Sequence, residues 1–196
     1  MFNRLAAGPI AIGLTLLSVF VTTLAMAQTP DSMVIDVGKI RFYEQINDQT
    51  WFASVPKGTL KADSIPLLNY RSDKIRKYKD GFPESLMEKD NVLKFVLHNS
   101  ADTVREVLIS PAIYFSSISL YRASDESANA RLERIPDSIA RKNLAYDGVR
   151  MIRLQPKERA AFYCSFQFVR TNINSFLPRL IEKEFINQWV GTIRDN

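Results

Sequence analysis

The feature that most constrains the fold is a two-residue alternation of apolar side chains in the second half of the chain. In residues 160–169, "AAFYCSFQFV", every second residue is apolar, and the residues between them are both polar and apolar. Successive side chains of a β-strand point to opposite faces, so the pattern predicts a half-buried strand. The expected inward set is Phe162, Cys164, Phe166 and Phe168, and the outward set is Tyr163, Ser165 and Gln167.

The same alternation occurs in residues 91–99, "NVLKFVLHN", which contain the single histidine of the chain. The pattern predicts that Leu93, Phe95 and Leu97 face the core and that Lys94, Val96 and His98 face outward. Turn formers follow, and a further strand is expected over residues 103–110. We interpret His98 as a surface or turn residue rather than a catalyst. A histidine-based zinc site is excluded, because the chain has no second histidine.

Short apolar segments, separated by polar or proline-bearing connectors, predict further strands on both sides of these two. They cover residues 33–37, 39–46, 48–55, 116–123, 130–135, 148–154 and 177–185. Trp51 and Phe52 are expected to cap the core. Residues 64–88 are irregular, with one short helix expected over residues 83–90, where Pro83 suits the first helical position. Many short strands without intervening amphipathic helices predict an all-β fold, a jelly-roll-like antiparallel β-sandwich.

The first 27 residues have the features of a secretory signal peptide. Arg4 precedes a long apolar stretch that ends in Ala-Met-Ala before Gln28, which is typical of a cleavage site. A transmembrane anchor is the alternative, because the stretch is nearly long enough to span a bilayer. We expect cleavage and a periplasmic or cell-surface location, with membrane attachment if the chain is part of a longer receptor. Residues 28–90 are expected to form an N-terminal part of the same domain, and residues 91–190 its sandwich core.

Composition argues against several classes of function. The formal net charge is +5, and the basic residues are interspersed with acidic ones. The densest basic cluster, residues 71–80, contains two aspartates, so we interpret it as a solvated segment rather than a nucleic-acid site. Cys164 is the one cysteine, which excludes an internal disulfide and a cysteine-rich zinc site. No glycine-rich phosphate loop is present. We therefore expect no cofactor, no metal and no nucleic-acid partner.

The order of motifs after residue 91 resembles the type 2 extracellular domain of bacterial 7TMR-DISM receptors, the seven-transmembrane receptors with diverse intracellular signalling modules. The matching positions are Phe95, Asn99 and Ser100 at a strand and turn, Leu120 and Tyr121 in the next strand, residues 156–158 in a later turn, and residues 162–168 in the strand after it. The resemblance spans about residues 35–186. Val92 or Leu93 stands where the family often has Trp, and Lys157 replaces the usual turn glycine.

The resemblance implies a sandwich similar to carbohydrate-binding modules that acts as a sensory ligand-binding domain. Aromatic and hydrogen-bonding side chains on an outward face suit sugar rings. The candidate ligand contacts are Tyr121, Arg122, Tyr146, Arg150, Tyr163, Gln167 and Trp189, each of which is read more simply as an ordinary surface or rim residue.

Two other functions stay open at the level of sequence. The chain could be a secreted interaction or structural module that binds an envelope protein and no small molecule. It could also cleave glycans, which requires two carboxylates facing one cleft. The glutamates 106, 133, 158, 182 and 184 are read more simply as solvent-facing charges in strands or turns. We therefore expect no catalytic residue, and a carbohydrate, another small ligand or a membrane receptor segment as the partner.

Overall fold

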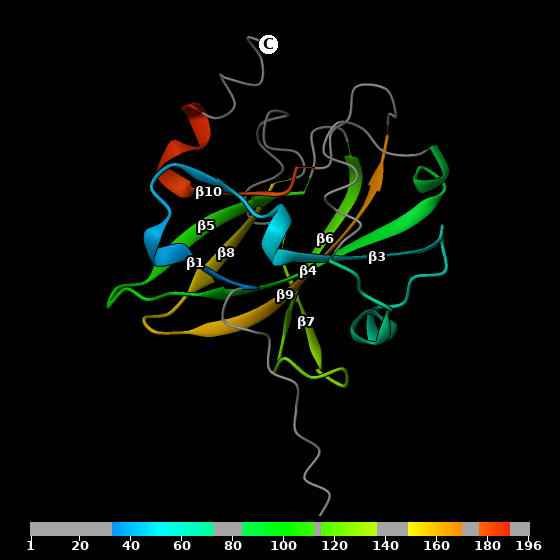
Figure 1. Ribbon diagram of the computed structural model, residues 1–196, viewed down its shortest axis with the longest axis horizontal. Coiled ribbons are helices and arrows are strands. Elements are labelled where there is room, and N and C mark those ends of the chain that lie inside the picture. The colour runs from blue at the N-terminus through cyan, green and yellow to red at the C-terminus, as the bar shows by residue number, and fades with distance from the viewer. Residues whose placement is uncertain (1–32, 73–83, 112–114, 137–148, 170–176, 189–196) are drawn as a thin grey trace, which may run out of the picture.

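The computed structural model describes residues 33–72, 84–111, 115–136, 149–169 and 177–188. Within them the chain is all-β, as the sequence predicts, with strands in two sheets and only short helical turns (Figure 1). The strands are β1 (Val34–Asp36), β2 (Tyr43–Gln45), β3 (Thr50–Pro56), β4 (Lys89–His98), β5 (Arg105–Ser110), β6 (Phe115–Ala123), β7 (Leu132–Ile135), β8 (Arg150–Leu154), β9 (Arg159–Phe168) and β10 (Arg179–Glu182). The 3-10 turns are η2 (Val37–Lys39), η3 (Asn47–Gln49), η4 (Ala62–Leu67), η5 (Glu84–Leu86) and η7 (Lys183–Phe185).

The larger sheet has six strands, built around the central pair β4 and β9. Its order is β1-β4-β9-β6-β7, and β3 pairs with the same edge of β4 as β1. Strand β3 runs antiparallel to residues 89–95 of β4, and β1 runs parallel to residues 96–98. The smaller sheet has four strands in the order β2-β10-β5-β8. The N-terminal strands therefore belong to both sheets.

The main core lies between the two sheets and confirms the predicted inward faces. Leu93, Phe95 and Leu97 of β4 pack there with Phe162, Cys164, Phe166 and Phe168 of β9. Val107, Ile109, Ile152, Leu154 and Leu180 come from the smaller sheet. The rings of Phe95 and Phe162, which are cross-strand partners, stack with centroids 5.8 Å apart. Contacts of this kind across neighbouring strands stabilise a sheet.

The outer face of the larger sheet is buried too, which corrects the expectation that it meets solvent. Val96 and Tyr163 are both 0% exposed and pack in a second apolar cluster with Ile65, Ala130 and Ala161. The covering residues come from the segment that contains η4 and from the loop between β6 and β7. These covering segments have no regular hydrophobic period. The alternation of side chains on β4 and β9 therefore does not predict that the outer face is covered.

The turn after β4 forms as predicted and is fixed by a buried amide. Asn99 is 0% exposed, and its Nδ2 donates to the carbonyl oxygens of Thr103 and Gln155 at 2.8 and 2.9 Å. His98 is the last residue of β4, half-exposed and paired with Arg159. Lys157 has a φ of 59°, in the left-handed region that favours glycine. Its ammonium donates to the Ser100 carbonyl at 2.6 Å.

The N-terminal part differs in detail from the expected elements. Phe52 is buried in the main core, but Trp51 packs on the outer face of the larger sheet. The expected helix over residues 83–90 is reduced to the 3-10 turn η5, because Lys89 and Asp90 already pair in β4. Pro83 and the signal-peptide residues lie outside the described ranges. Within the described ranges, no helix has the length and apolar character needed to cross a membrane.

Candidate functional site

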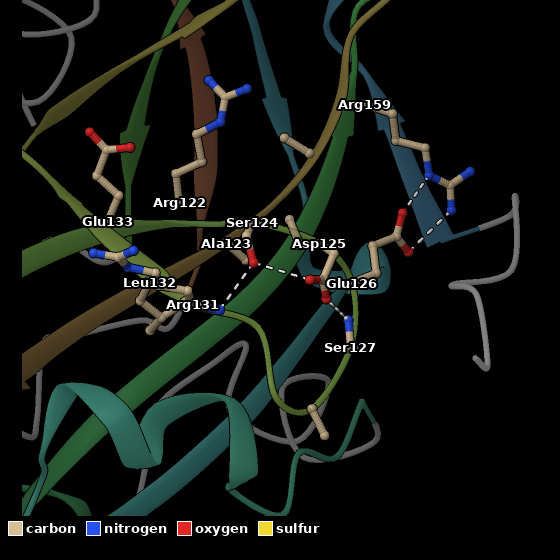
Figure 2. Close-up of a pocket in the computed structure, with 13 residues that line it drawn as sticks. Arg122, Ala123, Ser124, Asp125, Glu126, Ser127, Arg131, Leu132, Glu133 and Arg159 are labelled. Carbon is tan, nitrogen blue, oxygen red and sulfur yellow. Dashed lines mark hydrogen bonds and ion pairs between the residues drawn. The ribbon is translucent and has the colours of Figure 1, made fainter. Parts of the chain in front are cut away.

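A pocket with a volume of about 1200 Å³ opens beside the hairpin formed by β6 and β7 (Figure 2). Its lining comes from residues 122–128 at the end of β6 and the following loop, residues 131–133 at the start of β7, and residues 159–161 at the start of β9. Ligand sites of proteins are concavities, and most of the residues that line this one are polar or charged.

Small side chains of the larger sheet line part of the pocket. Ala123 and Ala161 belong to the outer face, with Leu132 as the cross-strand partner of Ala123, whereas Ala160 packs in the main core. In the next outer-face row of the sheet the side chains are much larger, since Tyr163 pairs with Tyr121 there. Tyrosines on β6 and β9 therefore give way to alanines where the pocket begins.

One wall of the pocket is an ion pair between the loop and β9. Arg159 donates from Nε to Glu126 Oε1 at 2.6 Å and from Nη2 to Oε2 at 3.3 Å, as the two dashed lines on the right of Figure 2 show. A two-pronged contact between arginine and a carboxylate is directional as well as strong. It holds the loop against the start of β9.

The loop beside Glu126 is shaped by a second carboxylate. Asp125 Oδ1 accepts the backbone N–H of Ser127 at 2.8 Å, and its Oδ2 accepts the Ser124 hydroxyl at 3.1 Å. These hydrogen bonds lower the pKa of Asp125 below its usual value. The carboxylate therefore stays ionised and available as an acceptor at the mouth of the pocket.

The hairpin itself contributes arginine and glutamate side chains. Arg122 forms an ion pair with Glu158, whose side chain is only 14% exposed. Glu158 also accepts the backbone N–H of Gln155 at 2.6 Å, so it is not the solvent-facing charge that the sequence suggested. Glu133 lies opposite Arg122 in the ladder between β6 and β7. Arg131 is exposed, and its backbone N–H donates to Ser124 Oγ at 3.0 Å.

Next to the pocket, Lys94 lies among three aromatic rings. Its Nζ is 5.9 Å from the ring centroid of Trp51, 6.0 Å from that of Tyr70 and 5.8 Å from that of Tyr163. Burial lowers the pKa of Lys94, and the charge of Glu126 partly offsets this. Trp51, Lys94, Tyr163 and Tyr121 are successive partners across β3, β4, β9 and β6, so they form one transverse row.

The two tyrosines of this cluster differ in their hydrogen bonding. The hydroxyl of Tyr70 donates to the Ile65 carbonyl at 2.8 Å, which ties the covering segment to itself. The hydroxyl of Tyr163 is buried and has no hydrogen-bond partner among the described residues. Burial raises the pKa of Tyr163 to about 12, with a contribution from the nearby charges of Asp125 and Glu126.

The structure brings part of the predicted ligand set together. Arg122 lines the pocket, and Tyr121 and Tyr163 form the row beside it. The expectation that Tyr163 lies on the surface is wrong, because η4 and its flanking residues cover it. Tyr146 and Trp189 lie outside the described residues.

Two other predicted contacts lie away from the pocket. Arg150 is 7% exposed, and its Nη2 donates to the Ile118 carbonyl at 3.1 Å, so its expected surface position is wrong. It is buried because β8 places it at the rim of the core, where the β6 backbone accepts its hydrogen bond. Gln167 is half-buried, and its Nε2 donates to Asp90 Oδ1 at 2.6 Å.

Sequence reasoning missed most of the pocket. The sequence predicts polar connectors over residues 124–129 and 155–159, yet Glu126 and Arg159, one from each, form an ion pair. The paired alanines at positions 160 and 161 gave the one usable signal, since small residues beside a run of aromatic ones leave space. The local sequence does not predict that these alanines lie next to the β6–β7 hairpin.

Groups suited to metal or covalent chemistry are not gathered in the described part of the chain. Within it, no three His, Cys, Asp or Glu residues are placed to hold a metal ion. Cys164 is fully buried, and burial raises its pKa to about 12, so the thiol stays protonated at neutral pH. The chain matches no protein-family model, and no curated protein sequence is significantly similar to it.

Proposed function

We propose that this protein is an extracytoplasmic ligand-sensing domain of, or related to, a bacterial membrane signalling receptor, with the hairpin pocket as its ligand site. The observation that carries the proposal is the pocket beside the hairpin, which is lined by convergent charged and hydroxyl side chains and includes the Arg159–Glu126 pair. The signal-peptide features of residues 1–27 and the motif order shared with 7TMR-DISM type 2 domains support the location and the receptor context. We extend the proposal to a jelly-roll connection of the strands.

We propose a carbohydrate as the class of ligand. Tyr121 is half-buried two residues before the pocket-lining Ala123, and an aromatic ring can take the apolar face of a sugar. Ser124, Asp125 and Ser127, which line the pocket, offer donors and acceptors for hydroxyl groups. This combination of an aromatic surface and convergent polar groups is what a small polar ligand requires.

Binding rather than catalysis is the role that the pocket carboxylates suit. Glu126 is engaged by Arg159, and hydrogen bonds lower the pKa of Asp125. A general acid that cleaves a glycosidic bond needs a carboxyl group with a raised pKa. In this pocket the hydrogen bonds to Asp125 instead lower its pKa and favour the ionised carboxylate.

A thermal-shift screen over soluble glycans tests the proposal. A ligand that binds only the native state raises the melting temperature by mass action. Blocking the pocket with Ala128→Trp should remove the shift, whereas the control Ala62→Trp, at an exposed alanine of η4, should keep it. A shift that survives Ala128→Trp would place the ligand elsewhere. No shift over the panel, together with capture of an envelope protein, would favour the interaction-module alternative.

A further inference from the structure

The charged side chains that line the pocket fall into two groups. Four of them already have protein partners: Arg159 and Glu126 pair with each other, Arg122 pairs with Glu158, and Asp125 accepts two hydrogen bonds from serines. Arg131 and Glu133 make up the second group. Neither side chain has an ion-pair or hydrogen-bond partner among the residues that the structure describes, and both are exposed.

These two side chains are close in the chain and held on an ordered frame. They lie two positions apart at the start of β7, so their Cα atoms are about 7 Å apart if the backbone is extended. Glu133 is fixed by its ladder position opposite Arg122. Arg131 is fixed by its backbone, since its N–H donates to Ser124 Oγ and its carbonyl accepts the Ser124 N–H at 2.9 Å.

A guanidinium and a carboxylate that both face one pocket select for a ligand with the opposite pair of charges. Charge-assisted hydrogen bonds are about twice as strong as neutral ones, and complementary charges exclude wrong partners. Leu132, between them in the chain, packs instead on the outer face of the sheet with Ala123 and Ala161, so the charged groups are what Arg131 and Glu133 offer on their side. A neutral sugar would use the serines of the pocket but would leave both charges to water.

We infer that the ligand of the hairpin pocket is a zwitterion, whose carboxylate binds Arg131 and whose ammonium group binds Glu133. The inference rests on the proposed function and sharpens its ligand class. Two sources share this chemistry: a short peptide with free termini, and a saccharide that carries an amino group and a carboxylate.

Calorimetry and thermal shift on the whole chain test it with matched probes. The peptide arm uses trialanine, N-acetyl-trialanine and trialanine amide. The saccharide arm uses a glucosamine–glucuronate disaccharide with a free amino group and its N-acetylated form, and cellobiose and maltose are the neutral probes. One zwitterionic probe should bind, and blocking either charge should weaken it about tenfold or more.

Variants assign each charge to its residue. Arg131→Gln should remove the effect of blocking the carboxylate, and Glu133→Gln should remove the effect of blocking the amine, while Arg153→Gln, an exposed arginine of β8, should change neither. Tight binding of cellobiose or maltose, lost in Ala128→Trp, would overturn the zwitterion and leave the sensor proposal standing. Binding of none of the probes in either assay would overturn the inference. Binding of charged probes that is indifferent to both glutamine variants would overturn it as well.

Discussion

The two faces of the larger sheet are both buried, but by different means. Its inner face is apolar along β4 and β9 and packs against a second sheet. Its outer face carries Lys94, two tyrosines and alanines, and is covered by irregular segments. The inner face gains its stability from area removed from water, whereas the outer face depends on polar groups finding partners. The comparison teaches that irregular segments can bury a sheet face as well as a second sheet does.

The largest effect should come from a cavity in the inner face. Phe162→Ala removes a ring that is 0% exposed and stacked on Phe95, so we expect it to lower the free energy of unfolding by about 3–5 kcal/mol. Urea denaturation followed by tyrosine and tryptophan fluorescence measures this. Gln167→Ala, on the outer side of the same strand, is the control and should cost far less. Equal losses would show that the two faces are not distinct.

Cys164 tests how dry the inner face is. Because burial raises the pKa of its thiol from 9.0 to about 12, iodoacetamide should not alkylate the native protein at pH 8 but should alkylate it in denaturant. The folded pKa is the higher one, so the stabilisation from the protonated thiol is complete below pH 9 and is lost as the pH rises toward 12. Mass spectrometry and pH-dependent melting check both statements. Rapid native alkylation would contradict them.

On the outer face, the ammonium group of Lys94 should stabilise the aromatic cluster. Lys94→Met keeps most of the alkyl chain but removes the charge that lies within 6.0 Å of three ring centroids. We expect a loss of about 1–2 kcal/mol, measured by urea denaturation. Lys61→Met, at an exposed lysine, serves as the control for removal of a charge. A stabilised Lys94→Met variant would mean that burial of the charge outweighs its contact with the rings.

The paired tyrosines of that cluster should respond in opposite directions. Tyr70→Phe loses a hydrogen bond to Ile65 and should lower stability by about 1 kcal/mol. Tyr163→Phe removes a buried hydroxyl that lacks a partner among the described residues, and it should raise stability by about 1 kcal/mol. Melting curves of the two variants, measured in parallel with the unmodified protein, test both expected changes in stability. A similar loss in both variants would show that the Tyr163 hydroxyl is hydrogen-bonded in solution.

The smallest effect should come from the Arg159–Glu126 pair at the pocket. Its side chains are 31% and 20% exposed, and pairs near the surface contribute at most about 1 kcal/mol. A double-mutant cycle with Arg159→Gln and Glu126→Gln should give a coupling energy below that figure, and a smaller one at high salt. A coupling that salt does not change would indicate a pair shielded from water.

The inner face could be predicted from sequence because it obeys a local rule. Phe162, Cys164, Phe166 and Phe168 recur at the period of a strand, and the structure buries each one. The turn at Asn99 was equally visible, since its side chain bonds to nearby backbone groups. Both features depend on short stretches of chain.

The outer face could not be predicted in the same way. Whether Tyr163 is exposed depends on Ile65 and Tyr70, which lie in a segment without a regular hydrophobic period. The pocket depends on three separate stretches of chain, and its main ion pair joins positions 126 and 159. Single-residue candidates chosen by chemistry alone therefore included Arg150, which is buried elsewhere. Contacts between distant segments were the missing information.

Strand β4 holds partners from both ends of the chain, and this has a kinetic consequence. It pairs with β1 and β3, which precede it, and with β9, which is made much later. Non-local pairing must overcome loop-closure entropy before its contacts stabilise the fold, so we expect slow folding that is completed only after β9 has been synthesised. The nascent polypeptide would thus remain an open chain for most of its synthesis.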